Sequence, residues 1–202
     1  MAVAGLGVAV AREGADQRLV PARGTALLLI DVINDMSFPG AAPLVRQADA
    51  MSARLAVLKR RATRAGIPAV YVNDNFGRWR SDFRHTVSHC SRRRSPGRRL
   101  VARLRPTSRD YFVLKPMHSG FFGTSLDVLL GTLGVTSVML TGIAGNICVL
   151  FTANDAYMRQ LRILAPSDCI VSNTARENTI ALRQMASVMK ADIRPSTALK
   201  FR

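Results

Sequence analysis

The sequence contains only three cysteines in 202 residues, and it has no run of 18 consecutive apolar residues. Three cysteines are too few, and odd in number, for the disulfide framework of a small secreted protein. The lack of a long apolar run excludes an ordinary transmembrane helix. Because 48% of the residues are hydrophobic, the chain can still bury a continuous core. These features predict a single globular domain in the cytoplasm, with no membrane partner.

Acidic residues and lysines are also scarce. The chain has 13 Asp and Glu against 29 Lys and Arg, a formal net charge of +16, and only four of the basic residues are lysines. Ten of the arginines, with a single acid, lie between Arg78 and Arg105. A local basic loop is a weaker signal for nucleic-acid binding than a basic face that carries aromatic residues. We therefore do not expect nucleic acid as a partner, and the role of the arginine-rich segment 92–105 stays open.

The first 23 residues show no regular pattern. Residues 1–11 are apolar and end in Ala-Val-Ala, which superficially resembles a signal-peptide cleavage site. They lack a basic start, however, and Gly5 and Gly7 interrupt the short apolar stretch. We predict a flexible N-terminal extension over residues 1–23 and one folded domain over residues 24–202.

From residue 25 onward, short apolar runs alternate with longer segments of helical period. The run 26–30 is apolar throughout and ends at Asp31, which is typical of a strand buried on both faces. Strands are predicted at 26–30, 67–72, 111–114, 137–140, 162–164 and 191–194, helices at 44–65, 96–104, 125–133, 146–159 and 175–189, and a long loop at 73–91. This alternation predicts a three-layer α/β sandwich, with a six-stranded, mainly parallel sheet and helices on both faces.

Chemically active side chains follow three of the predicted strands. Asp31 follows the first strand, Lys115 ends the third, and the fourth runs into a segment that contains Cys148. Ligands of an open parallel sheet bind beyond the carboxyl ends of its strands, so these side chains are expected at one edge. A helix N-terminus and a nearby lysine would lower the pKa of the Cys148 thiol, and a carboxylate could accept its proton. Taken singly, each side chain also has a structural interpretation: a small buried cysteine, a lysine that reaches water, and a turn acid.

Three segments resemble the isochorismatase-like cysteine hydrolases, in the same order along the chain. They are LLLIDVINDM at 27–36, KPMHSGFFGT at 115–124 and TGIAGNICV at 141–149, which continues to residue 157. The resemblance covers about residues 25–187 and implies the strand order 3-2-1-4-5-6 in a Rossmann-like sheet.

The resemblance also implies roles for the site residues. Cys148 would be the nucleophile, Asp31 the general base and acid, and Lys115 the cation that activates the thiol. A cis peptide bond is implied at Ile143–Ala144, with the backbone N–H groups of Ala144 and Cys148 as the oxyanion hole.

The implied reaction is hydrolysis of a C–N bond in a small amide or carbamoyl compound, through a thioester and without an organic cofactor. Two alternatives stay open. One is an isochorismatase-type hydrolase of a small carboxylated substrate, and the other is a non-catalytic relative whose basic loop binds an acidic partner or nucleic acid. Because members of the family commonly form dimers or tetramers, a homo-oligomer is expected.

Metal binding is not expected. Metal-dependent nicotinamidases of the family carry an Asp-x-His motif after the second strand, where this chain has Asn73-Asp74-Asn75. Amide side chains bind transition metals poorly. His85 and His89 are spaced like a zinc pair on a helix, but arginines crowd them on both sides, so a solvated loop is favoured.

The wall of the substrate pocket is expected to come from the loops after the second and third strands. The substrate-binding candidates are Phe38, Asn73, Phe76, Trp79, Phe122 and Phe151. Trp79 follows Gly77 and is either part of a lid or an oligomer contact. Arg78 or Arg80 could pair with a substrate carboxylate.

Overall fold

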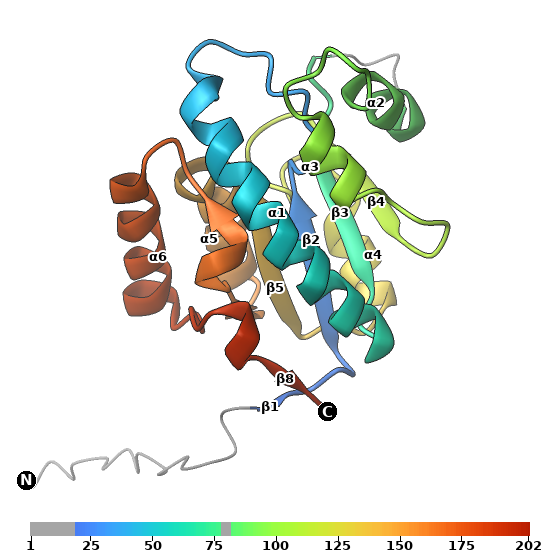
Figure 1. Cartoon of the computed structure of the whole chain (residues 1–202). Helices are drawn as coiled ribbons and strands as arrows, with labels where there is room; N and C mark the ends of the chain where they lie inside the picture. The colour runs from blue at the N-terminus through green and yellow to red at the C-terminus, as the bar shows by residue number, and fades with distance from the viewer. Residues whose placement is uncertain (1–18, 78–81) are drawn as a thin grey trace, which may run out of the picture.

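A parallel sheet runs through the centre of the protein (Figure 1). The computed structural model describes residues 19–77 and 82–202, and within them the main sheet has the order β4-β3-β2-β5-β6, with β7 paired to β5. The strands are β2 (Thr25–Ile30), β3 (Ala69–Asp74), β4 (Tyr111–Lys115), β5 (Ser137–Ile143), β6 (Arg162–Leu164) and β7 (Ile170–Val171). This order confirms the predicted sheet for its first five strands. The sixth predicted strand is present as a single parallel bridge between Leu164 and Asp192.

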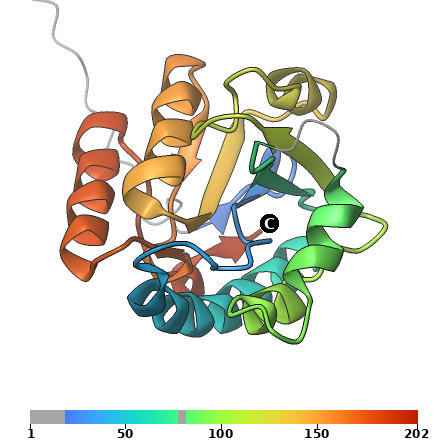
Figure 2. The ribbon, with the colours of Figure 1, turned by 90° about the horizontal axis from the view of Figure 1, so that it is seen from above.

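Helices cover both faces of the sheet, which confirms the predicted three layers (Figure 2). The helices are α1 (Ala41–Arg64), α2 (Phe83–Cys90), α3 (Arg98–Arg103), α4 (Leu126–Thr132), α5 (Leu150–Met158) and α6 (Ala175–Met189), with short turns at Gly145–Val149, Ser167–Cys169 and Ser196–Ala198. Helices α1, α2 and α3 pack on one face and α4, α5 and α6 on the other. No helix in the described ranges combines the length and the hydropathy that crossing a membrane requires.

Strand β2 shows why the sequence folds in this way. All six of its side chains are buried. Leu27 and Leu29 belong to the core under α1, whereas Leu28 and Ile30 belong to the core under α4, α5 and α6. A strand that buries both faces must be apolar without alternation, and this is the pattern in the sequence.

Helix α2 corrects the prediction of a continuous loop over residues 73–91. Asp82 begins the helix, because its side chain accepts a hydrogen bond of 2.7 Å from the backbone N–H of His85. Phe83, Thr86 and Cys90 then place their side chains on one buried face. The many arginines and serines of this segment conceal that short apolar face in the sequence.

A second, two-stranded sheet joins the two ends of the described chain. Strand β1 (Leu19–Val20) pairs in parallel with β8 (Lys200–Phe201), and Val20 is buried. Arg61 supports this pairing, because its guanidinium donates to the carbonyl oxygens of Ser196 and Leu199. Residues 19–23, predicted as part of a flexible extension, thus pack on the domain, which begins before the predicted boundary at residue 24. Residues 1–18 lie outside the described part of the chain, so a flexible extension there stays a prediction.

Strands β2 and β5 approach each other closely at Gly142. This residue pairs with Ile30 and has a φ of +112°, a conformation that favours glycine. A Cβ atom added to Gly142 would lie 2.0 Å from the carbonyl oxygen of Ile30. Glycine is therefore required where β5 passes the end of β2, immediately before the segment that carries Cys148.

We predict that Gly142→Ala lowers the free energy of unfolding by about 2–5 kcal/mol, because backbone strain and overpacking add. Urea and thermal unfolding would measure the change. The matched control is Gly131→Ala in α4, where an added Cβ meets nothing within 4 Å. This control should leave stability unchanged or raise it by up to about 1 kcal/mol. Wild-type stability of the Gly142 variant would contradict the prediction.

Candidate active site

The structure brings Asp31, Lys115 and Cys148 together at the carboxyl edge of the sheet. The Lys115 Nζ atom lies 2.9 Å from Asp31 Oδ2 and 3.6 Å from Cys148 Sγ. Lys115 is fully buried and Asp31 nearly so. Strand β3 lies between β2 and β4, so Lys115 reaches toward Asp31 across two strand spacings of about 4.8 Å each. This distance explains why a long side chain occupies the end of β4.

Backbone contacts fix the position of Asp31. Its φ is +50°, a left-handed conformation that turns the chain sharply at the end of β2. The Asp31 N–H donates to the carbonyl of Val72 at 2.9 Å, and Asp31 Oδ1 accepts the N–H of Asp74 at 2.7 Å. One carboxylate oxygen is thus held by β3, while the other pairs with Lys115.

Asp74 is a site residue that the sequence analysis considered only as part of a missing metal motif. Its Oδ2 atom lies 3.5 Å from Lys115 Nζ, and its side chain is 31% exposed. Asp74 ends β3, the strand that lies between β2 and β4. The predicted second strand ended at residue 72, so a strand that continues to Asp74 would have placed this carboxylate beside the lysine. Lys115 therefore faces two acidic groups.

Cys148 lies in a π-helical turn, Gly145–Val149, that follows β5 and leads into α5. The carbonyl of Cys148 accepts the hydroxyl of Thr152 at 2.7 Å, and the same hydroxyl accepts the N–H of Gly120 at 3.0 Å. Thr152 therefore ties the turn to the loop after β4. The peptide bond Ile143–Ala144 is cis, at the bond named from the family resemblance.

A second anchor holds the start of the π-helical turn. The hydroxyl of Ser172 accepts the N–H of Asn146 at 3.0 Å and donates to the side chain of Asn178 at 2.9 Å. An added Cβ on Gly145 would lie 2.7 Å from the Ser172 hydroxyl, so only glycine fits there. These contacts fix the backbone immediately before Cys148.

The electrostatics of the thiol differ from the expectation of a lowered pKa. Burial, reinforced by the Asp31 carboxylate and only partly offset by Lys115, raises the pKa of the Cys148 thiol to about 12. Burial also raises the pKa of Asp31, more than Lys115 lowers it. Burial lowers the pKa of Lys115, but Asp31 and the other neighbours raise it by more, so it lies above its usual value. At neutral pH the site thus combines a protonated thiol with a charged lysine.

The predicted pocket phenylalanines are all exposed: Phe38, Phe76, Phe122 and Phe151. Phe151 lies near the thiol, because its ring is 5.4 Å from that of His118, whose Nδ1 atom is 4.0 Å from Cys148 Sγ. Phe76 instead lines a small cavity of about 110 Å³ beside α2. The contact with His118 thus places the Phe151 ring next to the catalytic candidates.

The two remaining pocket candidates differ in what the structure describes. Asn73 is fully buried, and its amide exchanges two hydrogen bonds with the backbone of Ile33, at 3.2 and 2.7 Å. It therefore holds the segment after Asp31 in place. Trp79 lies outside the described residues, as do Arg78 and Arg80.

The described side chains that replace the metal motif of the nicotinamidases are engaged in other contacts. The Asn73 amide is occupied by Ile33, and the Asn75 side chain accepts the N–H of Gly77. His89 pairs with Asp35 at 2.9 Å, which attaches α2 to the segment that follows Asp31. Within the described ranges, no cluster of three or more His, Cys, Asp and Glu side chains has the arrangement of a metal site.

Comparison with known proteins gives a consistent result. Residues 25–193 match the isochorismatase domain. The chain is 41% identical over 168 residues to the isochorismatase family protein YaaI of Bacillus subtilis, covering 83% of this chain and 92% of the relative. It is also 41% identical to the ureidoacrylate amidohydrolase RutB of Acinetobacter baylyi, over 58 residues that make up 29% of this chain and 24% of that relative.

A solved structure is similar over most of the fold. The N-carbamoylsarcosine amidase of Thermoplasma acidophilum superposes with a TM-score of 0.66 and 27% sequence identity, covering 85% of this chain and 96% of that chain.

We predict that the rate of Cys148 alkylation by iodoacetamide keeps rising with pH above the pH range in which an ordinary thiol ionises. Asp31→Asn should move this rise to lower pH, because it removes the carboxylate that raises the thiol pKa. Lys115 keeps Asp74 as a partner in that variant. Mass spectrometry of the modified peptides would follow Cys148 separately from Cys90 and Cys169.

Asp127→Asn is the control for this experiment, because it removes a more exposed carboxylate on α4. It should leave the profile unchanged. The proposed electrostatics would be contradicted if the wild-type alkylation rate stopped rising at a pH near or below the pKa of a free thiol. An unshifted pH profile of Asp31→Asn would also contradict them.

Proposed function

The chain belongs to the isochorismatase family, and we propose that it is a metal-independent cysteine amidohydrolase that cleaves a C–N bond of a small amide or carbamoyl compound. The observation that carries the proposal is the position of Lys115 Nζ, 2.9 Å from a carboxylate of Asp31 and 3.6 Å from the sulfur of Cys148. An acid, a cation and a nucleophile within one buried cluster are what acyl transfer through sulfur requires.

In the first step, Cys148 Sγ attacks the carbonyl carbon of the substrate. Asp31 takes the thiol proton as the carbon–sulfur bond forms, because a thiol with a pKa of about 12 does not ionise beforehand at neutral pH. Asp31 then gives that proton to the departing nitrogen, the C–N bond breaks and a thioester remains. A carboxyl group whose pKa is raised by burial is suited to both transfers.

In the second step, Asp31 removes a proton from water, which attacks the thioester carbon. The C–S bond breaks, the acid product leaves and the sulfur regains its proton. Lys115 keeps its charge throughout, because its neighbours hold its pKa above the usual value. It stabilises negative charge on Asp31 and on the sulfur, while Asp74 provides a second counter-charge.

The negative charge of the tetrahedral intermediate would be stabilised by the backbone N–H groups of Ala144 and Cys148. The fixed turn before Cys148 supports this assignment, since preorganised donors stabilise an oxyanion without further rearrangement. Ser172 and Asn178 supply that rigidity through their contacts with Asn146 and with each other.

The substrate class rests on the relatives. The two amide hydrolases among the relatives are named for ureidoacrylate and N-carbamoylsarcosine, and both of these compounds contain a carbamoyl group. Phe151 supplies an apolar wall near the thiol, and Phe38, Phe76, Phe122 and Trp79 stay candidates for the rest of the pocket. A metal has no part in the proposal, because amides replace the donors of the metal-dependent motif. Cytoplasmic location and assembly into a dimer or tetramer also stay predictions.

The experiment measures ammonia release from a panel of primary amides and N-carbamoyl compounds. At least one compound should be turned over, and EDTA should leave the rate unchanged. Cys148→Ser should lower the rate by about a thousandfold or more, and Asp31→Asn by about a hundredfold or more. Asp127→Asn should retain wild-type activity. Full activity of the Cys148 variant, or no turnover of any compound, would refute the mechanism.

A further inference from the structure

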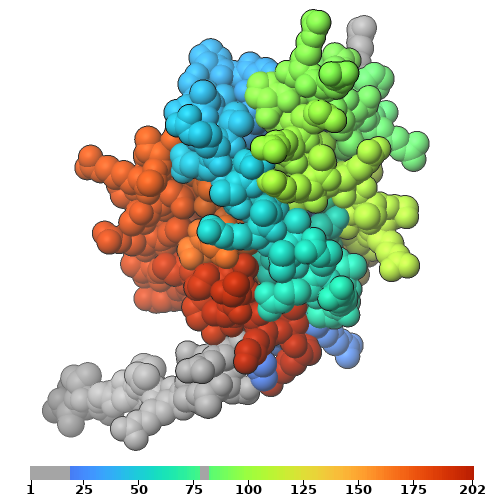
Figure 3. All heavy atoms as spheres, in the orientation of Figure 1, coloured from blue at the N-terminus to red at the C-terminus, as the bar shows by residue number. Residues whose placement is uncertain are grey.

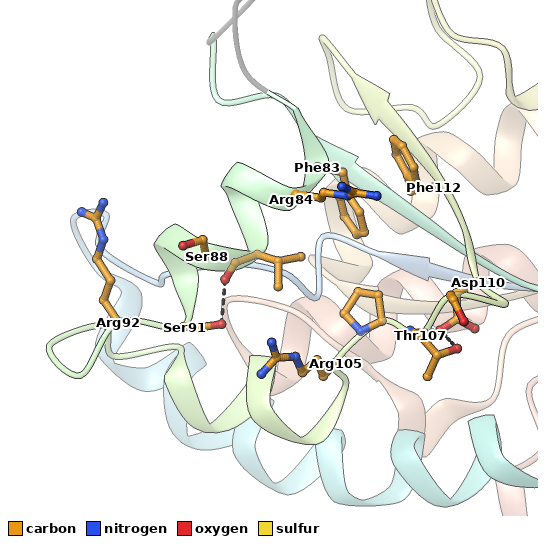
Figure 4. Close-up of a pocket in the computed structure, with 12 residues that line it drawn as sticks. Phe83, Arg84, Ser88, Ser91, Arg92, Arg105, Thr107, Asp110 and Phe112 are labelled. Atoms are coloured by element: carbon orange, nitrogen blue, oxygen red, sulfur yellow. Dashed lines mark hydrogen bonds between the residues drawn. The ribbon is translucent and has the colours of Figure 1, made fainter.

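A large hollow lies beside α2, and none of its lining residues belongs to the proposed catalytic site. It has a volume of about 680 Å³, in the range of small-molecule sites. It is bounded by α2 and by the segment that leads into β4, the edge strand of the sheet (Figure 4). Long side chains of the adjoining segment 92–105 project from the surface above α1 (Figure 3).

Three arginines line this hollow: Arg84, Arg92 and Arg105. Among the described residues, no carboxylate lies within ion-pair distance of any of them, whereas Arg99 and Arg103 pair with Asp49. Figure 4 shows Arg84 beside the aromatic rings and Arg105 on the opposite wall, while Arg92 points outward at one end. The hollow therefore has unpaired positive charge on two sides.

The acid that lines the hollow does not neutralise these arginines. Asp110 accepts Lys59 Nζ at 2.6 Å, and its Oδ2 atom also accepts the N–H of Thr107 at 2.7 Å. Its side chain is nearly buried in these contacts. The hydroxyl-bearing residues Ser88 and Ser108 also line the hollow and add polar groups to it.

A flat aromatic surface completes the hollow. Phe83 is buried and stacks on Phe112, with ring centroids 4.9 Å apart and planes inclined by 6°. Phe112 is 56% exposed, so it presents ring surface to the solvent. Because Phe83 supports it from the core, this ring is held in place before any ligand arrives.

We propose that this hollow binds a nucleoside phosphate. Its base would stack on the exposed ring of Phe112, and its phosphate would accept hydrogen bonds from the guanidinium groups of Arg84 and Arg105. Guanidinium groups match the geometry of phosphate oxygens, and an aromatic ring accepts the face of any base. A free phosphate would leave the ring unused, and an acidic peptide would leave its flat surface without a matching group.

Calorimetric titration of the full chain with adenosine 5′-monophosphate tests the proposal. The nucleotide should bind, whereas adenosine and inorganic phosphate should each bind about tenfold more weakly or less, because each lacks half of the contacts. Binding should weaken as salt is added. Arg84→Gln, Arg105→Gln and Phe112→Leu should each reduce the affinity by about five- to tenfold.

Arg93→Gln is the matched control, because Arg93 is an exposed arginine of the same segment that does not line the hollow. It should keep wild-type affinity. Cys148→Ser should also bind normally, so failure of the catalytic mechanism would not affect this result. The proposal would be overturned by no binding of the nucleotide at millimolar concentration, or by binding of single-stranded oligonucleotides alone. It would also be overturned if Arg93→Gln lost as much affinity as Arg84→Gln and Arg105→Gln, or if adenosine bound as tightly as the nucleotide.

Discussion

The buried charge of Lys115 is the constraint on which the candidate site depends. An ammonium group removed from water costs several kcal/mol unless opposite charges surround it. Asp31 meets this requirement at 2.9 Å and Asp74 at 3.5 Å, and the sulfur of Cys148 completes the cluster. The lysine therefore determines where the acidic groups must lie. The same burial that makes the pair costly raises the pKa of Asp31, which suits a group that both accepts and donates a proton.

The parallel sheet is what allows this cluster to form from distant parts of the chain. Parallel strands end at the same edge, so β2, β3, β4 and β5 deliver their final residues to one region. The close passage of β5 past β2 at Gly142 sets the start of the turn that carries the sulfur. Thr152 and Ser172 then hold that turn from two sides. Rigidity of this kind keeps reacting groups aligned without motion during the reaction.

The sheet could be predicted from the sequence because its strands are clear apolar runs. The positions of Asp31, Lys115 and Cys148 could be predicted because each of these residues follows one of those runs. It did not predict α2, whose buried face consists of Phe83, Thr86 and Cys90 among charged and polar residues. Asp74 lacked a role because the second strand was predicted to end at residue 72, whereas β3 extends to Asp74 and brings its carboxylate to the same edge as Lys115.

The direction of the thiol pKa was wrong for a related reason. The expectation counted the helix terminus and Lys115, but the burial of the sulfur and its nearness to Asp31 are properties of the folded chain. Strands β1 and β8 were also missed, since two residues are too few to give a periodic signal.

The hydrogen bond of 2.9 Å between His89 and Asp35 attaches helix α2 to the segment that follows Asp31. One side of this helix lines the arginine-lined hollow, and its His89 contacts Asp35 in the segment that follows Asp31. A small displacement of α2 would therefore change both the shape of the hollow and the position of the segment that follows Asp31. If one occupant favours a particular position of the helix, thermodynamic reciprocity requires the two binding equilibria to influence each other by the same factor. The contact between His89 and Asp35 thus joins the helix that walls the hollow to the segment that follows Asp31.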